Sequence, residues 1–388
     1  MNLPDELWQL LRDVPALKQA YLVGGCVRDA LLSRPQKDFD LEVYGVDYET
    51  LARELNAFGR VDRVGKSFGV IKFSSPTGEQ WDFSIPRRDS KQSAGHKGFH
   101  VEFDPNIALA EAASRRDFTI NALMFDPRTG EYLDFFGGRQ DLERRILRHT
   151  SAAFTDDPLR VLRGMQFVAR FDLTPAPETV ALCRSIVHTF AELAVERVGM
   201  EWFKWAELSH RPSSGMRFLQ ATAWLQHFPE IAALANTPQD SEWHPEGDVF
   251  THTCHCCDAL AELPEWQAVD VTTRQVLMFA VLAHDFAKPQ TTHIAEREGR
   301  MRIVSPGHEA QGGPLAEAFL TRIGSPNEIK TRVVPLVTHH LAHLQAASDR
   351  AVRRLANNLQ PATITELCLV MTADQFGRHQ NPKSFTRG

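Results

Sequence analysis

The alternation of apolar and polar residues divides the chain into an α/β part and a helical part. Four short stretches near the N-terminus combine β-branched and aromatic residues with the two-residue period of a strand. A helix is expected between the first two of them, and a hairpin follows around Pro127–Gly130. The predicted strands lie at 21–25, 39–45, 69–75 and 79–85, and the predicted helix at 27–34.

From about Asp141 the period becomes helical, and no further strand is expected. The amphipathic stretches lie at 157–171, 178–193 and 199–208. A segment rich in proline and acidic residues, 235–248, interrupts the helices and is interpreted as a linker. We therefore predict an α/β head followed by two all-α domains, with boundaries at 1–140, 141–235 and 245–388.

Composition narrows the class of protein. The chain has 388 residues, of which 43% are hydrophobic and 24% charged, as in an ordinary globular protein. No apolar run reaches the roughly 18 residues that cross a bilayer, so no membrane association is expected. The acidic amphipathic start does not resemble a signal peptide, and six cysteines do not form a disulfide framework, so we expect a cytoplasmic protein. A net charge of −6 argues against a generally basic surface but not against a local basic groove.

Two aspartates in the second predicted strand are the first candidate for chemistry. Asp38 and Asp40 share one face of the strand, and Phe39, between them, points to the other face. Carboxylates about 7 Å apart along a strand can converge on hard divalent cations such as Mg²⁺, which prefer carboxylate and phosphate oxygens. For an isolated pair of this kind, the alternative is two solvated side chains on an edge strand.

Two glycines precede this pair at the turn from the first strand to the helix. Gly24 and Gly25 would let backbone N–H groups approach a phosphate, and Arg28 would reach a triphosphate oxygen. A tight strand–helix turn without any ligand would also use two glycines. The aspartates that follow favour the phosphate interpretation.

The stretches LVGGCVRDALL and DFDLEV together resemble the first signature of class II tRNA nucleotidyltransferases, the CCA-adding enzymes, and of the related bacterial poly(A) polymerases. The resemblance extends over nearly the whole chain. It implies a polymerase-β-like nucleotidyltransferase head at 1–140. It also implies that Asp38 and Asp40 bind Mg²⁺, that Gly25 and Arg28 bind the triphosphate, and that Asp82 is a third catalytic carboxylate.

The stretch at 113–126 is similar to the family's second motif. Arg116 would contact phosphate or ribose, and Asp117 would accept a hydrogen bond from the 2′-hydroxyl, which distinguishes ribonucleotides from deoxyribonucleotides. Asn121 would lie on the same face as Asp117 if the segment is helical. The structural alternative is a helix-capping aspartate with exposed arginines.

The stretch at 154–171 resembles the motif that selects the incoming base. Asp157 and Arg160, three residues apart, would project together and imitate a Watson–Crick edge for C and A. Arg163 and Gln166 continue the same motif. An ordinary surface ion pair is the alternative for the first two. This chain departs from the family by carrying Asp156 in place of glutamate and Gln166 in place of arginine.

Three further segments follow from the resemblance. The polar stretch between 82 and 115 corresponds to the flexible loop that helps the enzyme change from C to A. The basic and aromatic stretches at 143–149 and 194–205 would bind the tRNA acceptor end, although Trp202 and Trp205 are interpreted as core residues.

The C-terminal part is rich in histidine, in an order that resembles the HD phosphohydrolases. Imidazole and carboxylate ligands together suit Ni, Mn, Co or Fe. The first predicted metal set is His252, His284, Asp285 and Asp374, and a second metal or phosphate is assigned to His308, His339 and His340. Buried core histidines are the alternative, and Cys254, Cys256 and Cys257 are interpreted as small helix residues.

The resemblance implies an enzyme that adds C, C and A to the tRNA acceptor end from CTP and ATP, with an HD phosphohydrolase activity on 2′,3′-cyclic phosphate ends. Relatives often continue past the HD domain. Partial addition of CC or A, poly(A) synthesis, an HD hydrolase with a nucleotide-sensing head, and an RNA-binding module are the alternatives that the sequence leaves open.

Overall fold

The computed structural model describes residues 1–36, 38–63, 69–91, 99–344 and 348–378, and the side chains of 88–101 are left out of the description. The chain packs as two compact units, 1–160 with 175–179, and 161–174 with 180–388. The boundary falls within a helix, α6 (Leu159–Phe171). The three functional domains expected from the sequence stay a prediction.

A seven-stranded mixed sheet organises the first unit, in the order β3-β4-β5-β2-β1-β8-β9. The pair β2–β5 is parallel, and the other pairs are antiparallel. All four predicted strands and the β8–β9 hairpin are confirmed. The strands are β1 (Ala20–Val23), β2 (Phe39–Val43), β3 (Arg60–Asp62), β4 (Val70–Ser74), β5 (Gln80–Ser84), β8 (Met124–Asp126) and β9 (Glu131–Leu133).

Within the segment expected to be a flexible loop, the chain forms a two-stranded ribbon, β6 (Arg87–Lys91) and β7 (Phe99–Phe103). Residues 92–98 of that segment lie outside the described residues. Both described ends of the segment are therefore paired as strands rather than irregular, and backbone pairing takes up the polar groups of their main chain.

One face of the large sheet is apolar and covered by helices. Phe39, Leu41 and Val43 of β2 are buried there together with Leu10 and Leu51 from the covering helices. Because side chains alternate along a strand, the acidic residues of β2 are turned to the opposite face. The helical segments of this unit are α1 (Asp5–Asp13), η1 (Pro15–Gln19), α2 (Gly25–Leu31), α3 (Tyr48–Leu55), α4 (Leu109–Ser114), η3 (Thr119–Asn121), α5 (Gly138–Glu143) and η4 (Ala152–Asp156).

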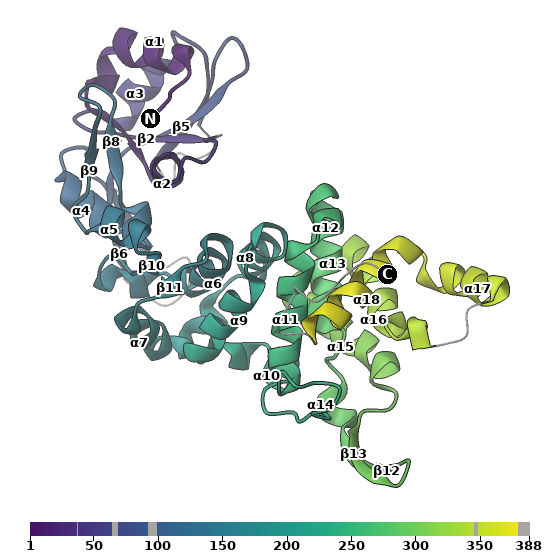
Figure 1. Cartoon of the computed structure of the whole chain (residues 1–388). Helices are drawn as coiled ribbons and strands as arrows, with labels where there is room; N and C mark the ends of the chain where they lie inside the picture. The colour runs from purple at the N-terminus through teal and green to yellow at the C-terminus, as the bar shows by residue number, and fades with distance from the viewer. Residues whose placement is uncertain (37, 64–68, 92–98, 345–347, 379–388) are drawn as a thin grey trace. The chain divides into compact units, whose positions relative to one another are not determined.

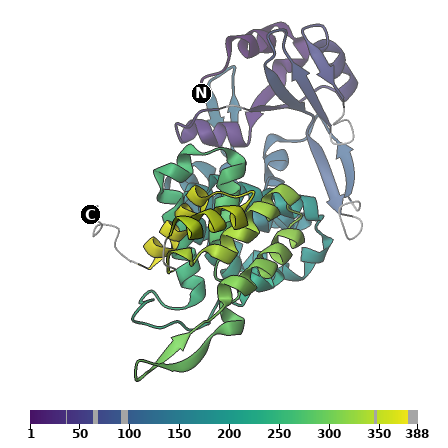
Figure 2. The same cartoon turned by 90° about the vertical axis from the view of Figure 1, so that its right-hand side faces the viewer.

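The rest of the chain is mainly helical, as the sequence predicted (Figures 1 and 2). Helix α13 (Val271–Ala283) is its central element, since every residue from Val276 to Ala283 is buried and the helix contacts α11, α15, α16 and α18. The other segments are α7 (Pro177–Ser185), η5 (Val187–Glu192), α8 (Val195–Leu208), α9 (Pro212–Ala221), η6 (Trp224–His227), α10 (Pro229–Ala232), α11 (Val249–Glu262), α12 (Pro264–Ala268), α14 (Lys288–Thr291), α15 (His308–Arg322), α16 (Asn327–His339), η7 (Ala342–Leu344), α17 (Asp349–Leu359) and α18 (Ile364–Gly377). Trp202 and Trp205 are fully buried in α8, which confirms them as core residues.

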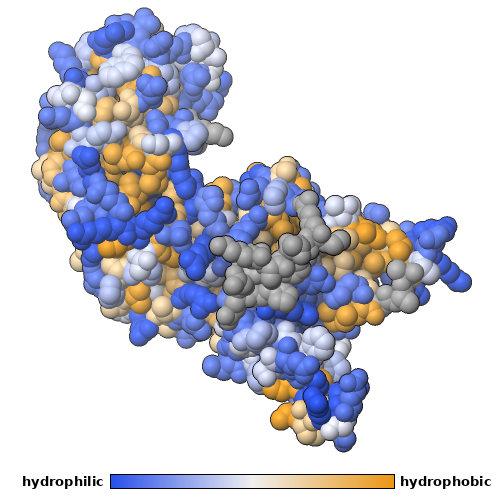
Figure 3. Space-filling model, in the orientation of Figure 1, coloured by the Kyte–Doolittle hydropathy of each residue, from blue (hydrophilic) through white to orange (hydrophobic). Residues whose placement is uncertain are grey.

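The expectation of no further strands is wrong. Short strands β10 (Ile146–Leu147) and β11 (Thr174–Pro175) occur, and β12 (His293–Arg297) pairs with β13 (Arg300–Val304) in a ribbon that extends from the helices. Glu298 and Gly299 form its turn with positive φ angles of 52° and 74°. Most of the ribbon's residues are exposed, and Figure 3 shows apolar and polar atoms mixed on it, so its sequence lacks the alternation that burial imposes.

No helix in the described part of the chain is long and apolar enough to cross a membrane.

Candidate functional sites

Three carboxylates meet on the polar face of the sheet in the first unit. The parallel register of β2 and β5 sets Asp40 directly beside Asp82. Asp38 precedes β2 by one residue and is exposed, as Asp40 is, while Phe39 between them is buried. The structure therefore brings together all three carboxylates that the sequence analysis singled out.

These carboxylates repel one another. Loss of hydration raises the pKa of Asp40, the charges of Asp82 and Asp38 raise it further, and Arg116 opposes the rise. Although the Asp40 side chain reaches solvent, its carboxylate is held where ionisation is unfavourable. A bound divalent cation would reverse this cost, because its positive charge favours the ionised carboxylates.

Gly24 turns the chain from β1 into α2. Its φ of 73° lies in the left-handed region, and a Cβ there would lie 3.1 Å from Nη1 of Arg116. The left-handed backbone therefore favours glycine here, and a larger residue would also require the Arg116 guanidinium to shift by a few tenths of an ångström. Gly25 follows as the first residue of α2.

Arg28, Asn121 and Asp117 form one buried hydrogen-bond network. Arg28 donates from Nη1 to Asn121 Oδ1 at 2.6 Å and from Nε to Asp29 Oδ1 at 2.9 Å. The amide of Asn121 donates to Asp117 Oδ1 at 3.0 Å. The sequence analysis placed residues 117 and 121 on one face on condition that the segment is helical, and that condition is not met: Phe118 forms an extended bridge with His149, and the helical turn covers only Thr119–Asn121. The two side chains meet through a direct hydrogen bond instead.

Glu42 is a residue that the sequence analysis missed. It occupies the next position after Asp38 and Asp40 on the same face of β2, and this alternation was the signal that could have found it. Its Oε2 accepts a hydrogen bond from Tyr44 at 2.8 Å and lies 3.8 Å from Nη2 of Arg116. Glu42 therefore helps to position Arg116.

The residues of the proposed base-selection motif have partners within the protein. Asp157 accepts from the backbone N–H of Leu159 at 3.2 Å, and Arg160 donates to the carbonyls of Ala153 and Arg115 at 2.6 and 2.5 Å. Further along α6, Nη1 of Arg163 lies 3.9 Å from Glu201 Oε1, and Gln166 is buried with its Oε1 lacking a hydrogen bond. The role of this motif in base choice stays a prediction.

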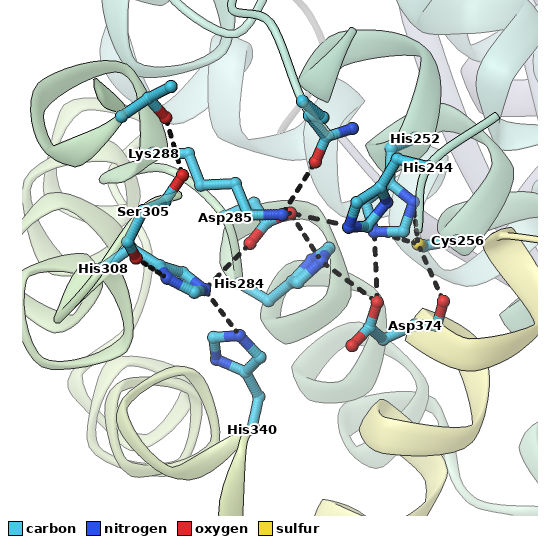
Figure 4. Close-up of polar contacts among 12 residues, drawn as sticks. His244, His252, Cys256, His284, Asp285, Lys288, Ser305, His308, His340 and Asp374 are labelled. Atoms are coloured by element: carbon cyan, nitrogen blue, oxygen red, sulfur yellow. Dashed lines mark hydrogen bonds and ion pairs between the residues drawn. The ribbon is translucent and has the colours of Figure 1, made fainter. Parts of the chain in front are cut away.

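The helical part contains a dense cluster of imidazoles and carboxylates (Figure 4). His252 comes from α11, His284 and Asp285 follow the end of α13, and Asp374 comes from α18. His252 Nε2 lies 3.1 Å from Asp374 Oδ1, and His284 Nε2 lies 3.2 Å from Asp285 Oδ2. The four residues predicted as the first metal set are thus brought together, and all are at least 98% buried.

A second group adjoins the first through Asp285. His308 Nε2 lies 3.3 Å from Asp285 Oδ1 and 3.2 Å from His340 Nε2. One ligand atom from each of these three residues lies within 4.8 Å of the others. His339, by contrast, is half-buried and belongs to none of the convergent groups in the described residues, so the structure separates it from His308 and His340.

The hydrogen bonds of these histidines turn one nitrogen toward the centre. Nδ1 of His284, His308 and His340 lies 2.7 Å from a backbone carbonyl in each case. A carbonyl only accepts, so each Nδ1 carries the proton and each neutral ring keeps a lone pair on Nε2. Nε2 of His284 is buried without a hydrogen bond. The Nε2 atoms of His308 and His340 lie 3.2 Å apart, so their lone pairs face each other. A metal cation at these atoms fits this donor set.

The electrostatics of the cluster agree with that fit. Burial and the charge of the neighbouring His284 together lower the pKa of His340 to about 3, so this ring is neutral. Burial raises the pKa of Asp374, but hydrogen bonding to His252 and the charge of His284 outweigh it and lower the pKa. Burial lowers the pKa of His284, but the charges of Asp285 and Asp374 outweigh it and raise the pKa, so protonation here relieves the crowding of carboxylates. A metal cation at Nε2 would take the place of that proton, beside the neutral His340 and the ionised carboxylates.

The sequence analysis missed several residues that support this cluster. Glu246, in the segment interpreted as a linker, accepts from Nδ1 of both His244 and His252 at 2.9 and 2.7 Å. Lys288 Nζ lies 2.7 Å from Asp285 Oδ2, and Arg378 lies 2.9 Å from Asp374 Oδ2. The available signal was spacing, because Lys288 follows Asp285 by three residues and Arg378 follows Asp374 by four.

Cys256 also lies beside the first metal group. Its Sγ is 3.4 Å from His252 Nε2. Burial raises the pKa of this thiol well above its usual value, so it is protonated and a poor metal ligand. The interpretation of Cys256 as a small helix residue agrees with this environment.

Comparison with known proteins gives three findings. Residues 20–148 match the family model described as the poly A polymerase head domain. The chain is 37% identical over 378 residues to the multifunctional CCA protein of Xanthomonas campestris pv. campestris (strain B100), covering 92% of this chain and 85% of that protein. It is 36% identical to the protein of the same name from Vibrio vulnificus (strain CMCP6), covering 93% and 86%.

Solved structures share the fold. A Thermotoga maritima CCA-adding enzyme complexed with tRNA aligns with a TM-score of 0.62 and 20% identity, covering 97% of this chain and 81% of that one. A Bacillus stearothermophilus CCA-adding enzyme in complex with CTP aligns with a TM-score of 0.63 and 20% identity, covering 96% and 78%.

Glu246→Gln is expected to weaken metal binding at the helical cluster. Burial raises the pKa of Glu246, but its hydrogen bonds with His244 and His252 lower it to about 2, so a full negative charge orients His252. Loss of such a partner costs about 10–100-fold in metal affinity, measured here by calorimetric titration with Ni²⁺ or Mn²⁺. Glu262→Gln, the same change at an exposed position of α11, should leave the affinity unchanged. Equal affinities in the two variants would contradict the role of Glu246.

Asp40→Asn is expected to stabilise the metal-free protein at neutral pH. The raised pKa of Asp40 means that its ionised form disfavours the folded state, and this penalty grows as pH rises through the folded pKa. The thermal midpoint in EDTA should therefore rise in the variant at pH 7, and the gain should shrink in acid, where the wild-type carboxyl is protonated. Asp13→Asn, at an exposed site, serves as the control. A lower midpoint for Asp40→Asn would show that the three carboxylates do not repel one another.

Proposed function

The chain belongs to the CCA-adding tRNA nucleotidyltransferase family, and we propose that it adds C, C and A in turn to the 3′ end of tRNA, using CTP and ATP. The observation that carries this proposal is the set of carboxylates at Asp38, Asp40 and Asp82 on one open face of the sheet. The relatives and structural neighbours support it, since they bear the names of CCA-adding proteins and two of the structures hold tRNA or CTP.

Divalent metal is part of this proposal, with Mg²⁺ as the ion that suits three carboxylates. When bound, Mg²⁺ would lower the pKa of the attacking 3′-hydroxyl and neutralise the leaving pyrophosphate. Asp38 and Asp40 would hold it, with Asp82 as the third carboxylate. Arg28, already oriented by Asn121 and Asp29, would contact the triphosphate beside Gly24 and Gly25.

Recognition of ribose and base is assigned to the residues next to this face. Asp117, aligned by Asn121, would accept a hydrogen bond from the 2′-hydroxyl of the ribose, and Arg116 would contact phosphate or ribose. Asp157 and Arg160 would form the protein template for C and A. Because Arg160 now donates to two backbone carbonyls, reading a base requires it to exchange those hydrogen bonds for bonds to the nucleotide. Arg163 and Gln166 would support that exchange from α6.

We also propose a metal-dependent phosphohydrolase activity for the helical cluster. The carrying observation is the convergence of imidazole lone pairs and ionised carboxylates in a buried centre. Such a donor set suits Ni, Mn, Co or Fe, which would supply an activated water for attack on a phosphate ester. The expected substrates are RNA ends with a 2′,3′-cyclic phosphate, so one activity would restore the end that the other extends.

The transferase is tested with a tRNA that lacks its CCA end, incubated with Mg²⁺ and CTP, ATP or both, and resolved at single-nucleotide length. With both nucleotides present, three added residues are expected. Two added residues would indicate a CC-adding enzyme, and a single added A would indicate an A-adding enzyme. A long ladder of A residues would indicate a poly(A) polymerase. Asp38→Ala and Asp40→Ala should each lower the rate by about 10³-fold or more, the scale on which loss of a charge-stabilising group acts in phosphoryl transfer. tRNA affinity should change little. Transfer that survives either change would refute the metal assignment.

The hydrolase is tested with adenosine 2′,3′-cyclic phosphate and added Ni²⁺ or Mn²⁺. His284→Ala should reduce turnover by more than the roughly 10–100-fold that follows loss of a ligand's hydrogen-bond partner. His339→Ala removes a neighbouring histidine that lies outside the convergent groups and should keep full activity. Neither change should affect tRNA extension. An equal loss in both variants would show that the cluster acts structurally.

A further inference from the structure

A pocket opens next to the second metal group, and one of its walls is an exposed tryptophan. The side chains that matter for its chemistry are Trp243, Asp285, Lys288, His308, Asp374 and Arg378. All belong to the helical part of the chain. The pocket thus joins both metal groups to an aromatic ring at the protein surface.

Trp243 is unlike the other tryptophans of the chain. Its relative exposure is 60%, whereas Trp8 is half-buried and the remaining five of the seven are at most 4% exposed. Trp243 therefore contributes little to the core. A single exposed apolar residue is ordinary on a protein surface, so its position at this pocket carries the argument rather than its exposure alone.

The segment that carries Trp243 is held in place on both sides of the ring. Its backbone N–H donates to Asp240 O at 3.1 Å, and Arg302 of β13 lies 3.4 Å from Asp240 Oδ1 and also pairs with Glu242. Lys288 donates to Gln239 Oε1 at 2.8 Å. On the far side, Glu246 is bonded to His252. The ring is therefore presented by a built loop that is tied directly to a metal ligand.

The charges in the pocket suit an anion once a metal is bound. The carboxylates of Asp285 and Asp374 are paired with Lys288 and Arg378 at 2.7 and 2.9 Å. These four charges cancel, and Asp240, a further carboxylate of the lining, is paired with Arg302 at 3.4 Å. A divalent cation would therefore leave the pocket positive. A phosphate would then be attracted to the metal groups, with the aromatic ring available to whatever group the phosphate carries.

We propose that Trp243 is a stacking platform for the terminal base of a nucleotide or RNA end whose phosphate lies at the metal groups. This inference rests on the proposed hydrolase function and deepens it, because it names the side chain that would bind the base of the RNA end. An indole face stacks on any base and reads no hydrogen-bond pattern. The site would therefore accept ends irrespective of which nucleotide is last.

Binding can be tested without turnover. Trp243 dominates the tryptophan fluorescence that acrylamide quenches, because five of the other six rings are buried and Trp8 is half-buried. With Mn²⁺ bound, as attraction of the phosphate requires, adenosine 2′-monophosphate should protect this fluorescence from acrylamide, and ribose 5-phosphate, which has a phosphate but no base, should not. The Trp243→Phe variant should lose the protectable component. Equal protection by both probes, or none by the adenosine nucleotide, would overturn the proposal.

Kinetics give a second readout, with glycerol 1,2-cyclic phosphate as the base-free partner of adenosine 2′,3′-cyclic phosphate. Trp243→Ala should raise KM for the nucleotide by about tenfold or more, the scale of one lost base stack, with kcat nearly constant. Trp243→Ala should also lower the preference for the nucleotide over the glycerol ester, and Trp243→Phe should keep most of that preference. An unchanged preference would refute stacking. Protection in the fluorescence assay without any hydrolysis would refute the hydrolase function and keep the nucleotide site.

Discussion

Repulsion between carboxylates held side by side is the constraint on which the candidate site of the first unit depends. The parallel register of β2 and β5 gives Asp40 and Asp82 no freedom to separate, because the apolar residues between the acidic ones are locked into the core on the other face. The pKa of Asp40 records the cost, and a divalent cation removes it. The repulsion lowers the free energy of unfolding of the metal-free protein, and binding of a divalent cation with its nucleotide would raise it again.

The helical cluster also holds charged and polar side chains close together, with imidazoles beside the carboxylates. Its imidazoles are aligned by carbonyls close by in sequence, such as Val281 for His284 and Val337 for His340, so each ring is aimed before any metal arrives. Buried carboxylates beside them stay ionised because cationic side chains and imidazoles surround them. A family resemblance predicted which residues gather here, but the orientation of each ring follows from its hydrogen bond to a nearby backbone carbonyl at the end or the start of a helix.

Local patterns predicted much of this molecule, and the misses share a cause. The strands of the head and the face shared by Asp38 and Asp40 followed from the period of two. The β12–β13 ribbon was missed because neither of its faces is buried, so burial left no pattern to read. Glu246 and Trp243 were missed because an acidic, proline-rich segment has the composition of a linker, whereas its contacts with His252 and Arg302 make it part of the site.

The sequence by itself determined the order of the elements, the alternating faces of β2 and the chemical types of the ligands. These depend on covalent geometry and on residues close in the chain. Only the tertiary structure decided that Asp82 stands beside Asp40, that Asn121 bonds to Arg28 across 93 positions, and that His339 is excluded while its neighbour His340 is included. Strand register, helix packing and the point at which α16 ends set those outcomes, and each results from the packing of the whole core rather than from any local run of residues.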